Sequence, residues 1–137
     1  MILADTSAWI EYDRATGSPV HRRLRGLIHD NGPLGVTEPV IMEVMAGARN
    51  DQREAALRRM LLRFQLLALD TSVDFDAAAR IYRQCRRAGV TPRGLVDCLI
   101  ASVARRHKAT LLAQDADLTQ VAQVVGIDLD HASFGRS

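Results

Sequence analysis

The sequence predicts an α/β fold of three layers, built around a parallel sheet with helices packed against it. Short apolar segments that are typical of buried strands alternate along the chain with longer segments of helical periodicity. No two strand-like segments are joined by a tight turn of the kind that forms a hairpin, which favours parallel strands. The length of 137 residues suits one domain, and no repeat or linker interrupts the pattern, so we expect a single domain over 1–137.

The first half of the chain is expected to contain two strands and four helices. Thr6 or Ser7 can cap the first helix, and Pro19 lies at the start of the second. Asn31 opens a turn before the second strand, and Pro39 marks the start of the helix after it. The expected elements are a strand over 2–5, a helix through 9–12, a helix from 17–19 onward, a strand over 34–36, a helix up to about 48 and a helix over 52–63.

The second half is expected to alternate in the same way. Gly89 ends a long amphipathic helix, and Pro92 and Gly94 lead into the next one. The expected elements are a strand over 66–69, a helix over 73–88, a helix over 95–107, a strand over 110–113, a helix over 118–125 and a candidate fifth strand over 127–129.

Composition places the chain among ordinary globular proteins. Hydrophobic residues make up 47% and charged residues 25% of the chain, and no apolar run is long enough to span a bilayer. The N-terminus lacks the basic and apolar regions of a signal peptide, so we expect a cytoplasmic protein without a membrane partner. Cys85 and Cys98 fall inside expected helices without a metal-ligand spacing, which favours reduced packing residues over a disulfide.

The basic residues are almost all arginine, with Lys108 as the exception, although the net charge is only +2. The planar guanidinium fork suits phosphate recognition. A codon bias that favours arginine over lysine across the genome explains the same skew, and we regard it as the better explanation.

Acidic residues stand in or beside segments that should be core. A carboxylate in such surroundings is costly unless another group pairs with it or coordinates it. A single acidic pocket that holds a hard divalent cation, Mg²⁺ or Mn²⁺, explains the whole set most simply. The residues concerned are Asp5, Glu43, Asp97, Asp115 and Asp117.

The expected topology can bring these residues together. In open parallel sheets, ligands bind beyond the carboxyl ends of the strands, where the strand order reverses. Asp5 ends the first strand and Asp115 follows the fourth, so the two carboxylates share one crevice if these strands are neighbours. Asp97 lies in the first turn of its helix, and Glu43 lies in the middle of the helix after the second strand.

Each acidic residue also has a purely structural explanation. Asp5 can cap the following helix, Asp97 can face a helix dipole, and either Asp115 or Asp117 can cap the last helix, the role we favour for Asp117. Glu43 can pair with an arginine such as Arg49 or Arg93. Four independent buried carboxylates are nevertheless improbable, because their mutual repulsion would raise their pKa values unless a cation compensated.

At these residues the chain resembles the PIN-domain ribonucleases, and specifically the VapC toxins of bacterial toxin–antitoxin pairs. The matching segments occur in the family's order and cover nearly the whole chain. They are ILADTSAWIEY with Asp5 and Ser7, EPVIMEVMAGA with Glu43, GLVDCLIASVARRH with Asp97, and ATLLAQDADLTQVA with Asp115.

The resemblance implies a parallel sheet in the order 3-2-1-4-5, with the first and fourth strands side by side. It also implies endonucleolytic cleavage of RNA, often tRNA or rRNA, that depends on Mg²⁺ or Mn²⁺. The implied partners are a small VapB-type antitoxin, whose C-terminal tail blocks the acidic cleft, and a second copy of the toxin. The family often has Thr or Ser and an aromatic residue where this chain has Ala113 and Leu118, so the choice between Asp115 and Asp117 as fourth acidic residue stays open.

Taken together, these observations predict a site for metal-assisted phosphodiester hydrolysis. We expect Asp5, Glu43, Asp97 and Asp115 to bind one or two divalent ions, with Glu43 orienting or deprotonating the attacking water. Auxiliary roles are expected for Thr6, Ser7 and Asp117. Because an acidic cleft repels RNA, arginines must hold the RNA backbone, and the candidates are Arg14, Arg49, Arg86, Arg87 and Arg93.

Three kinds of protein other than a nuclease are alternatives to this interpretation. A phosphoryl-accepting signalling domain needs a lysine late in the chain, but Lys108 precedes the fourth expected strand. A phosphatase of the haloacid-dehalogenase type needs Asp-x-Asp after the first strand, whereas Thr6 and Ser7 follow Asp5 here. In a non-enzymatic α/β interaction module, the acids would stabilise the fold or recruit a basic partner.

Overall fold

A parallel sheet lies at the centre of the computed structural model, which describes residues 1–135. The strand order is β3-β2-β1-β4, and every pairing is parallel. The three-layer α/β prediction is therefore confirmed, as is the prediction that the first and fourth strands are neighbours. The strands are β1 (Ile2–Ala4), β2 (Leu34–Val36), β3 (Gln65–Leu66) and β4 (Thr110–Leu112).

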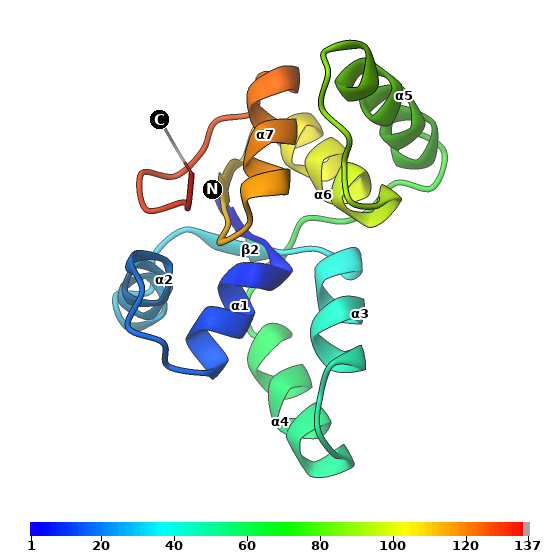
Figure 1. The fold of residues 1–137 in the computed structure, drawn as a ribbon. Coiled ribbons are helices and arrows are strands. Elements are labelled where there is room, and N and C mark those ends of the chain that lie inside the picture. Colours follow the sequence, from blue (N-terminus) through cyan, green and yellow to red (C-terminus); the bar gives the residue numbers. More distant parts are fainter. Residues whose placement is uncertain (136–137) are drawn as a thin grey trace.

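Helices surround the strands (Figure 1). In this view α5, α6 and α7 form a group above the strands, and α1, α2, α3 and α4 lie below them. None of the helices in the described part of the chain is long and apolar enough to cross a membrane. The helices are α1 (Thr6–Asp13), α2 (Pro19–His29), α3 (Glu38–Ala46), α4 (Asp51–Leu61), α5 (Asp74–Arg87), α6 (Leu95–Arg106) and α7 (Ala116–Val125).

Two strand predictions need correction. The third strand was expected over 66–69 but covers only Gln65–Leu66. The Leu67 N–H still donates to the backbone oxygen of Val36, the last residue of β2, and the chain then leaves the sheet toward α5. The expected fifth strand at 127–129 is reduced to a single parallel bridge between Leu129 and Leu111. This bridge still lies beyond β4, at the place that the order 3-2-1-4-5 gives the fifth strand.

The core explains why the central strands are short and apolar. Leu3, Leu111 and Leu112 are completely buried in β1 and β4, and Trp9 of α1 belongs to the same buried core. Strands that are covered on both faces need no polar alternation, which is the pattern of a parallel sheet between helices.

Side-chain caps determine where several helices begin. Asp5 caps α1, Ser18 caps α2 and Asn50 caps α4, each by accepting a hydrogen bond from a backbone N–H of the first turn. Asp115 does the same for α7, which therefore begins at Ala116 and not at the expected residue 118. Capping thus brings two of the acidic residues to helix N-termini.

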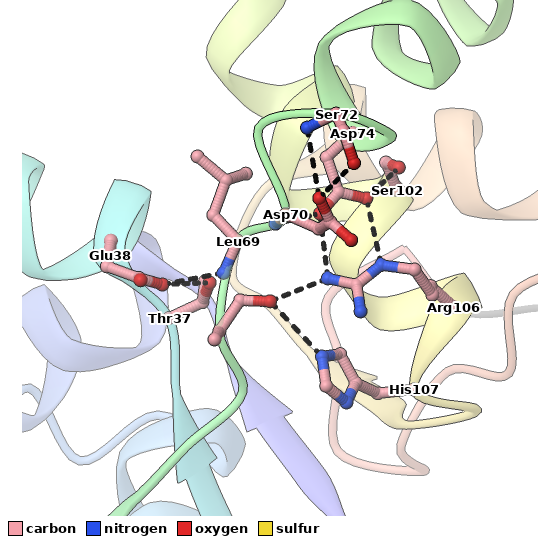
Figure 2. A network of polar contacts seen from close by, with 10 residues as sticks. Thr37, Glu38, Leu69, Asp70, Ser72, Asp74, Ser102, Arg106 and His107 are labelled. Carbon is pink, nitrogen blue, oxygen red and sulfur yellow. Dashed lines mark hydrogen bonds and ion pairs between the residues drawn. The ribbon is translucent and has the colours of Figure 1, made fainter.

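A buried polar network attaches α5 to α6 and to the loop that follows β3 (Figure 2). Asp74 is 0% exposed and accepts hydrogen bonds from the Ser102 hydroxyl at 2.7 Å and from Arg106 at 2.7 and 3.2 Å. Arg106 also donates to the backbone oxygen of Ala68 at 2.6 Å. Cys85 and Cys98 are buried in the same two helices as free thiols, in keeping with the prediction of packing residues.

Candidate active site

A pocket of about 380 Å³ opens where β1 and β4 end. The N-termini of three helices surround it, since α1 follows β1, α7 follows β4, and α6 begins beside them. The middle of α3 supplies the remaining wall. Each of these elements contributes one carboxylate to the lining: Asp5, Asp115, Asp97 and Glu43.

Asp5 is the most deeply buried of the four carboxylates, with only 2% of the residue exposed. Its Oδ2 accepts hydrogen bonds from the Ser7 hydroxyl at 2.6 Å and from the Ser7 backbone N–H at 3.0 Å. Its Oδ1 is buried and has no hydrogen-bond partner within the described residues. Burial raises the pKa of Asp5 to about 6, against the lowering effect of the bonds from Ser7. An orphaned carboxylate oxygen of this kind is costly unless a cation or a proton occupies it.

Ser7 holds Asp5 in place from two directions. Its Oγ donates to Asp5 and also accepts a hydrogen bond from the backbone N–H of Gln114 at 2.9 Å. Gln114 directly precedes Asp115, so Ser7 links the end of β1 to the segment that leaves β4. The auxiliary role expected for this hydroxyl stays a prediction.

Glu43 is held by Thr6 and not by an arginine. The Thr6 hydroxyl donates to Glu43 Oε1 at 2.6 Å, which ties α3 to the first residue of α1. Among residues 1–135, Glu43 makes no ion pair with Arg49 or Arg93, so the salt-bridge explanation considered for this carboxylate is wrong. Glu43 Oε2 is therefore available to the pocket.

Asp97 experiences the strongest repulsion of the set. It lies in the first turn of α6 and is partly buried. Burial is the largest cause that raises the pKa of Asp97, to about 7; the charges of Asp5, Asp115 and Glu43 act in the same direction, and Arg93 opposes them. A carboxyl group that titrates near neutrality inside an acidic pocket is a feature of functional sites.

Asp115 and Asp117 have different positions. Asp115 lines the pocket and is 13% exposed, whereas Asp117 lies outside the lining and is 48% exposed. Asp115 Oδ1 accepts from the backbone N–H groups of Asp117 and Leu118 at 2.9 and 3.4 Å, and Asp115 Oδ2 pairs with Arg93. The cap of α7 is thus formed by Asp115, which also lines the pocket, and the preference for Asp117 as the cap was wrong.

The donor set fits a hard divalent cation. All four groups are carboxylates, which magnesium and manganese prefer, and the buried Oδ1 of Asp5 has no hydrogen-bond partner among residues 1–135. Within residues 1–135, no three acidic, histidine or cysteine side chains are gathered tightly enough to form a ready-made metal cluster. The carboxylate of Glu43 is instead bonded to Thr6, and that of Asp115 to Arg93.

The arginines proposed for RNA binding fall into three places. Arg93 lines the acidic pocket itself. Arg14 and Arg49 line a neighbouring groove of about 450 Å³ that shares Ile10 and Glu43 with the pocket. The other two, Arg86 and Arg87, lie with Tyr82 and Arg83 in a separate depression on the last turns of α5 and belong to neither cavity.

The groove contains two charged residues, Arg53 and Asp13, that are not among the predicted site residues. Arg53 lies on its wall and pairs with Asp13, and neither residue carries a sequence motif that would have marked it. Trp9 also lines the groove, although it is 1% exposed and its indole Nε1 is buried without a hydrogen-bond partner among the described residues. The acidic pocket therefore continues into a groove of mixed basic and apolar character.

Comparison with known proteins identifies the class to which this fold and site belong. The PIN-domain family model matches residues 2–124. Ribonuclease VapC11 from Mycobacterium tuberculosis (strain ATCC 25618 / H37Rv) is 44% identical over 135 residues, which cover 98% of this chain and 99% of that protein. The VapC ribonuclease Mb1587 from Mycobacterium bovis shows the same identity and coverage.

Solved structures with the same fold include a toxin–antitoxin complex. The structure of VapBC2 from Rickettsia felis, bound to a DNA fragment from its promoter, matches with a TM-score of 0.73 at 17% identity and covers 95% of this chain and 98% of that one. VapC20 from Mycobacterium tuberculosis, described as a toxin that cleaves the sarcin–ricin loop, matches with a TM-score of 0.65 at 18% identity over 87% and 93% of the two chains. At these identities the likeness concerns the fold.

The chain belongs to the PIN-domain family and, within it, to the VapC ribonucleases of toxin–antitoxin systems. Family membership makes it a hydrolase that acts on RNA, so the signalling and non-enzymatic alternatives are set aside.

Proposed function

We propose that this protein is a Mg²⁺- or Mn²⁺-dependent endoribonuclease that cuts tRNA or rRNA in the cytoplasm, with residues 1–137 acting as one PIN domain. The observation that carries the metal dependence is the unpartnered, buried Oδ1 of Asp5 in a pocket with three other carboxylates. A cation at this position satisfies the orphaned oxygen and relieves the repulsion that raises the pKa of Asp97.

Asp5, Glu43, Asp97 and Asp115 would hold one or two such ions. When bound, the metal lowers the pKa of a coordinated water and neutralises charge that develops on the scissile phosphate. Glu43 accepts the proton from the attacking water, and the Thr6 hydroxyl keeps its carboxylate directed into the pocket. Ser7 keeps Asp5 in a single orientation. Asp117 contributes from outside the lining, through its contact with Arg93.

RNA would approach along the groove beside the acidic pocket. Arg14 and Arg49 lie on the wall of this groove, where guanidinium groups can bind backbone phosphates that the carboxylates would otherwise repel. Arg86 and Arg87 lie on a different surface, so a role in binding requires RNA long enough to reach α5. This requirement favours a structured RNA such as tRNA or rRNA over a short single strand.

The partner we propose is a VapB-type antitoxin, which fits the toxin–antitoxin complex solved for the Rickettsia felis neighbour. Exposed apolar side chains stand at the entrance of the pocket, because Ile10 and Leu95 line it and are 39% and 59% exposed. A peptide tail with a basic end would cover both residues and neutralise the carboxylates behind them. A homodimer is proposed on family resemblance.

The decisive experiment replaces Asp97 with asparagine. The Asp97→Asn enzyme should lose RNA cleavage by about 10²-fold or more in Mg²⁺, and its affinity for Mn²⁺ should fall in parallel. Asp76→Asn, a neutralised acid on the exposed face of α5, is the matched control and should behave like wild type. Cleavage by the Asp97→Asn enzyme at the wild-type rate would refute the proposed site.

A further inference from the structure

Within residues 1–135, Arg93 is the sole cationic side chain on the lining of the acidic pocket. It lies in the segment that connects α5 to α6, two residues before α6 begins. The side chain is 63% exposed, so its stem is not fixed by packing. Arg93 also lies close enough to Asp97 to offset part of the repulsion from the other carboxylates.

The guanidinium group of Arg93 covers a particular oxygen of Asp115. Asp115 Oδ1 caps α7, because it accepts hydrogen bonds from two backbone N–H groups of the first turn. Asp115 Oδ2 is therefore the oxygen with which this residue can bind a cation, and it is the oxygen that pairs with Arg93. The Nε of Arg93 lies 3.6 Å from Asp117 Oδ2 outside the pocket.

We propose that Arg93 alternates between two partners and thereby couples metal binding to RNA binding. In the metal-free enzyme it neutralises Asp115. When Asp115 Oδ2 binds a divalent ion, the exposed side chain turns outward and its fork binds a phosphate of the RNA beside the scissile bond. The inference rests on the proposed metal-dependent function and makes Arg93 a substrate-binding residue whose release depends on the metal. A guanidinium fork suits both partners, because it matches the planar geometry of carboxylate and phosphate oxygens.

This exchange predicts two effects of opposite sign. Metal must displace Arg93 from Asp115, so removal of the guanidinium should strengthen metal binding in the absence of RNA. The released group contacts RNA, so its removal should weaken RNA binding by the metal-loaded enzyme. Coupling of this kind is reciprocal, because each ligand raises the affinity for the other by the same factor. A residue that merely supported the fold would weaken both interactions.

The test uses the Arg93→Gln variant of the full chain. Its affinity for Mn²⁺, measured without RNA by electron paramagnetic resonance, should increase about fivefold or more. Its KM for total bacterial RNA in saturating Mn²⁺ should rise several-fold. Arg93→Lys keeps the charge without the fork, so it should retain near wild-type Mn²⁺ affinity while its KM still rises. The matched control is Arg80→Gln, which removes another exposed arginine that pairs with a carboxylate on α5.

One double variant and one single variant show how the effect of Arg93 arises. In an Asp115→Asn background, Arg93→Gln should no longer change the Mn²⁺ affinity, because the oxygen that both cations compete for has lost its charge. Unchanged or weaker Mn²⁺ binding by Arg93→Gln, or an unchanged KM, would overturn the inference. If Asp97→Asn weakens Mn²⁺ binding in the same experiment, the proposed metal site stands and the role of Arg93 alone is refuted. Mn²⁺ binding that is insensitive to Asp97→Asn would refute the proposed function itself.

Discussion

At the residue scale, the site depends on how two short side chains constrain two carboxylates. Ser7 holds one oxygen of Asp5, and Thr6 holds one oxygen of Glu43. In each case the other oxygen is left for the pocket. Hydroxyl groups that fix the orientation of metal-binding carboxylates contribute strongly to affinity although they touch no metal.

Replacement of Ser7 by alanine should separate orientation from ligation. The variant loses the 2.6 Å bond to Asp5 and the bond from the Gln114 N–H, while every carboxylate remains. We expect Mn²⁺ affinity or cleavage rate to fall about 10- to 100-fold. Isothermal titration and a cleavage assay measure the two quantities, with Ser72→Ala, which removes a bond to Asp70 on the surface, as control. A Ser7→Ala enzyme with wild-type values would show that Asp5 needs no support from this hydroxyl.

The raised pKa values of Asp5 and Asp97 predict how stability depends on pH in a chelator. Both groups have folded-state pKa values, about 6 and about 7, above the ordinary value of 3.8. Their contribution to stability is therefore fully present below pH 3.8 and is lost as pH rises through 6 to 7. At pH 8 in EDTA, Asp97→Asn should be more stable than wild type by about 1–3 kcal/mol, and the advantage should disappear at low pH.

Urea denaturation at several pH values measures this difference. An Asp97→Asn variant that is less stable than wild type at pH 8 without metal would contradict the electrostatic account. Asp76 has an exposed carboxylate on α5, so Asp76→Asn should show no comparable gain.

At the element scale, the positions of the helices follow from caps and buried polar contacts. Whether each segment forms a helix or a strand was predictable, because helical periodicity and short apolar runs are local patterns of the sequence. The ends of β3 and α7 were not, because they depend on partners elsewhere in the fold: β3 ends where its neighbour β2 ends, and α7 begins where Asp115 caps it. The network around Asp74 was also invisible in the sequence, since Ser102 and Arg106 are about thirty residues away.

Removal of the Asp74 charge should destabilise the contact between α5 and α6. The Asp74→Asn substitution leaves Arg106, whose side chain is 31% exposed, without the carboxylate partner that is 0% exposed in the wild type. We expect a loss of about 3 kcal/mol in the free energy of unfolding, measured by urea denaturation. Asp76→Asn, two residues along the same helix and exposed, should cost less than about 0.5 kcal/mol. Equal stability of the two variants would show that the network does not stabilise the interface.

At the scale of the whole molecule, the parallel topology gathers residues that are far apart in the chain. The acidic pocket was predictable because strands β1 and β4 are neighbours, and their ends must then share an edge of the sheet. The pairing of Arg93 with Asp115 and the groove that contains Trp9 were not predictable. They arise from side-chain contacts between loops and helices that no local pattern specifies.

Diffraction from crystals soaked in Mn²⁺, with anomalous scattering recorded above the manganese edge, tests the central claim most directly. We predict a peak inside the acidic pocket at about 2.0–2.4 Å from Asp5 Oδ1, with Asp97 as a second ligand, and no such peak in the Asp97→Asn protein. A pocket without an anomalous peak, in a protein that cleaves RNA in the same Mn²⁺ solution, would contradict the metal site on which the account depends.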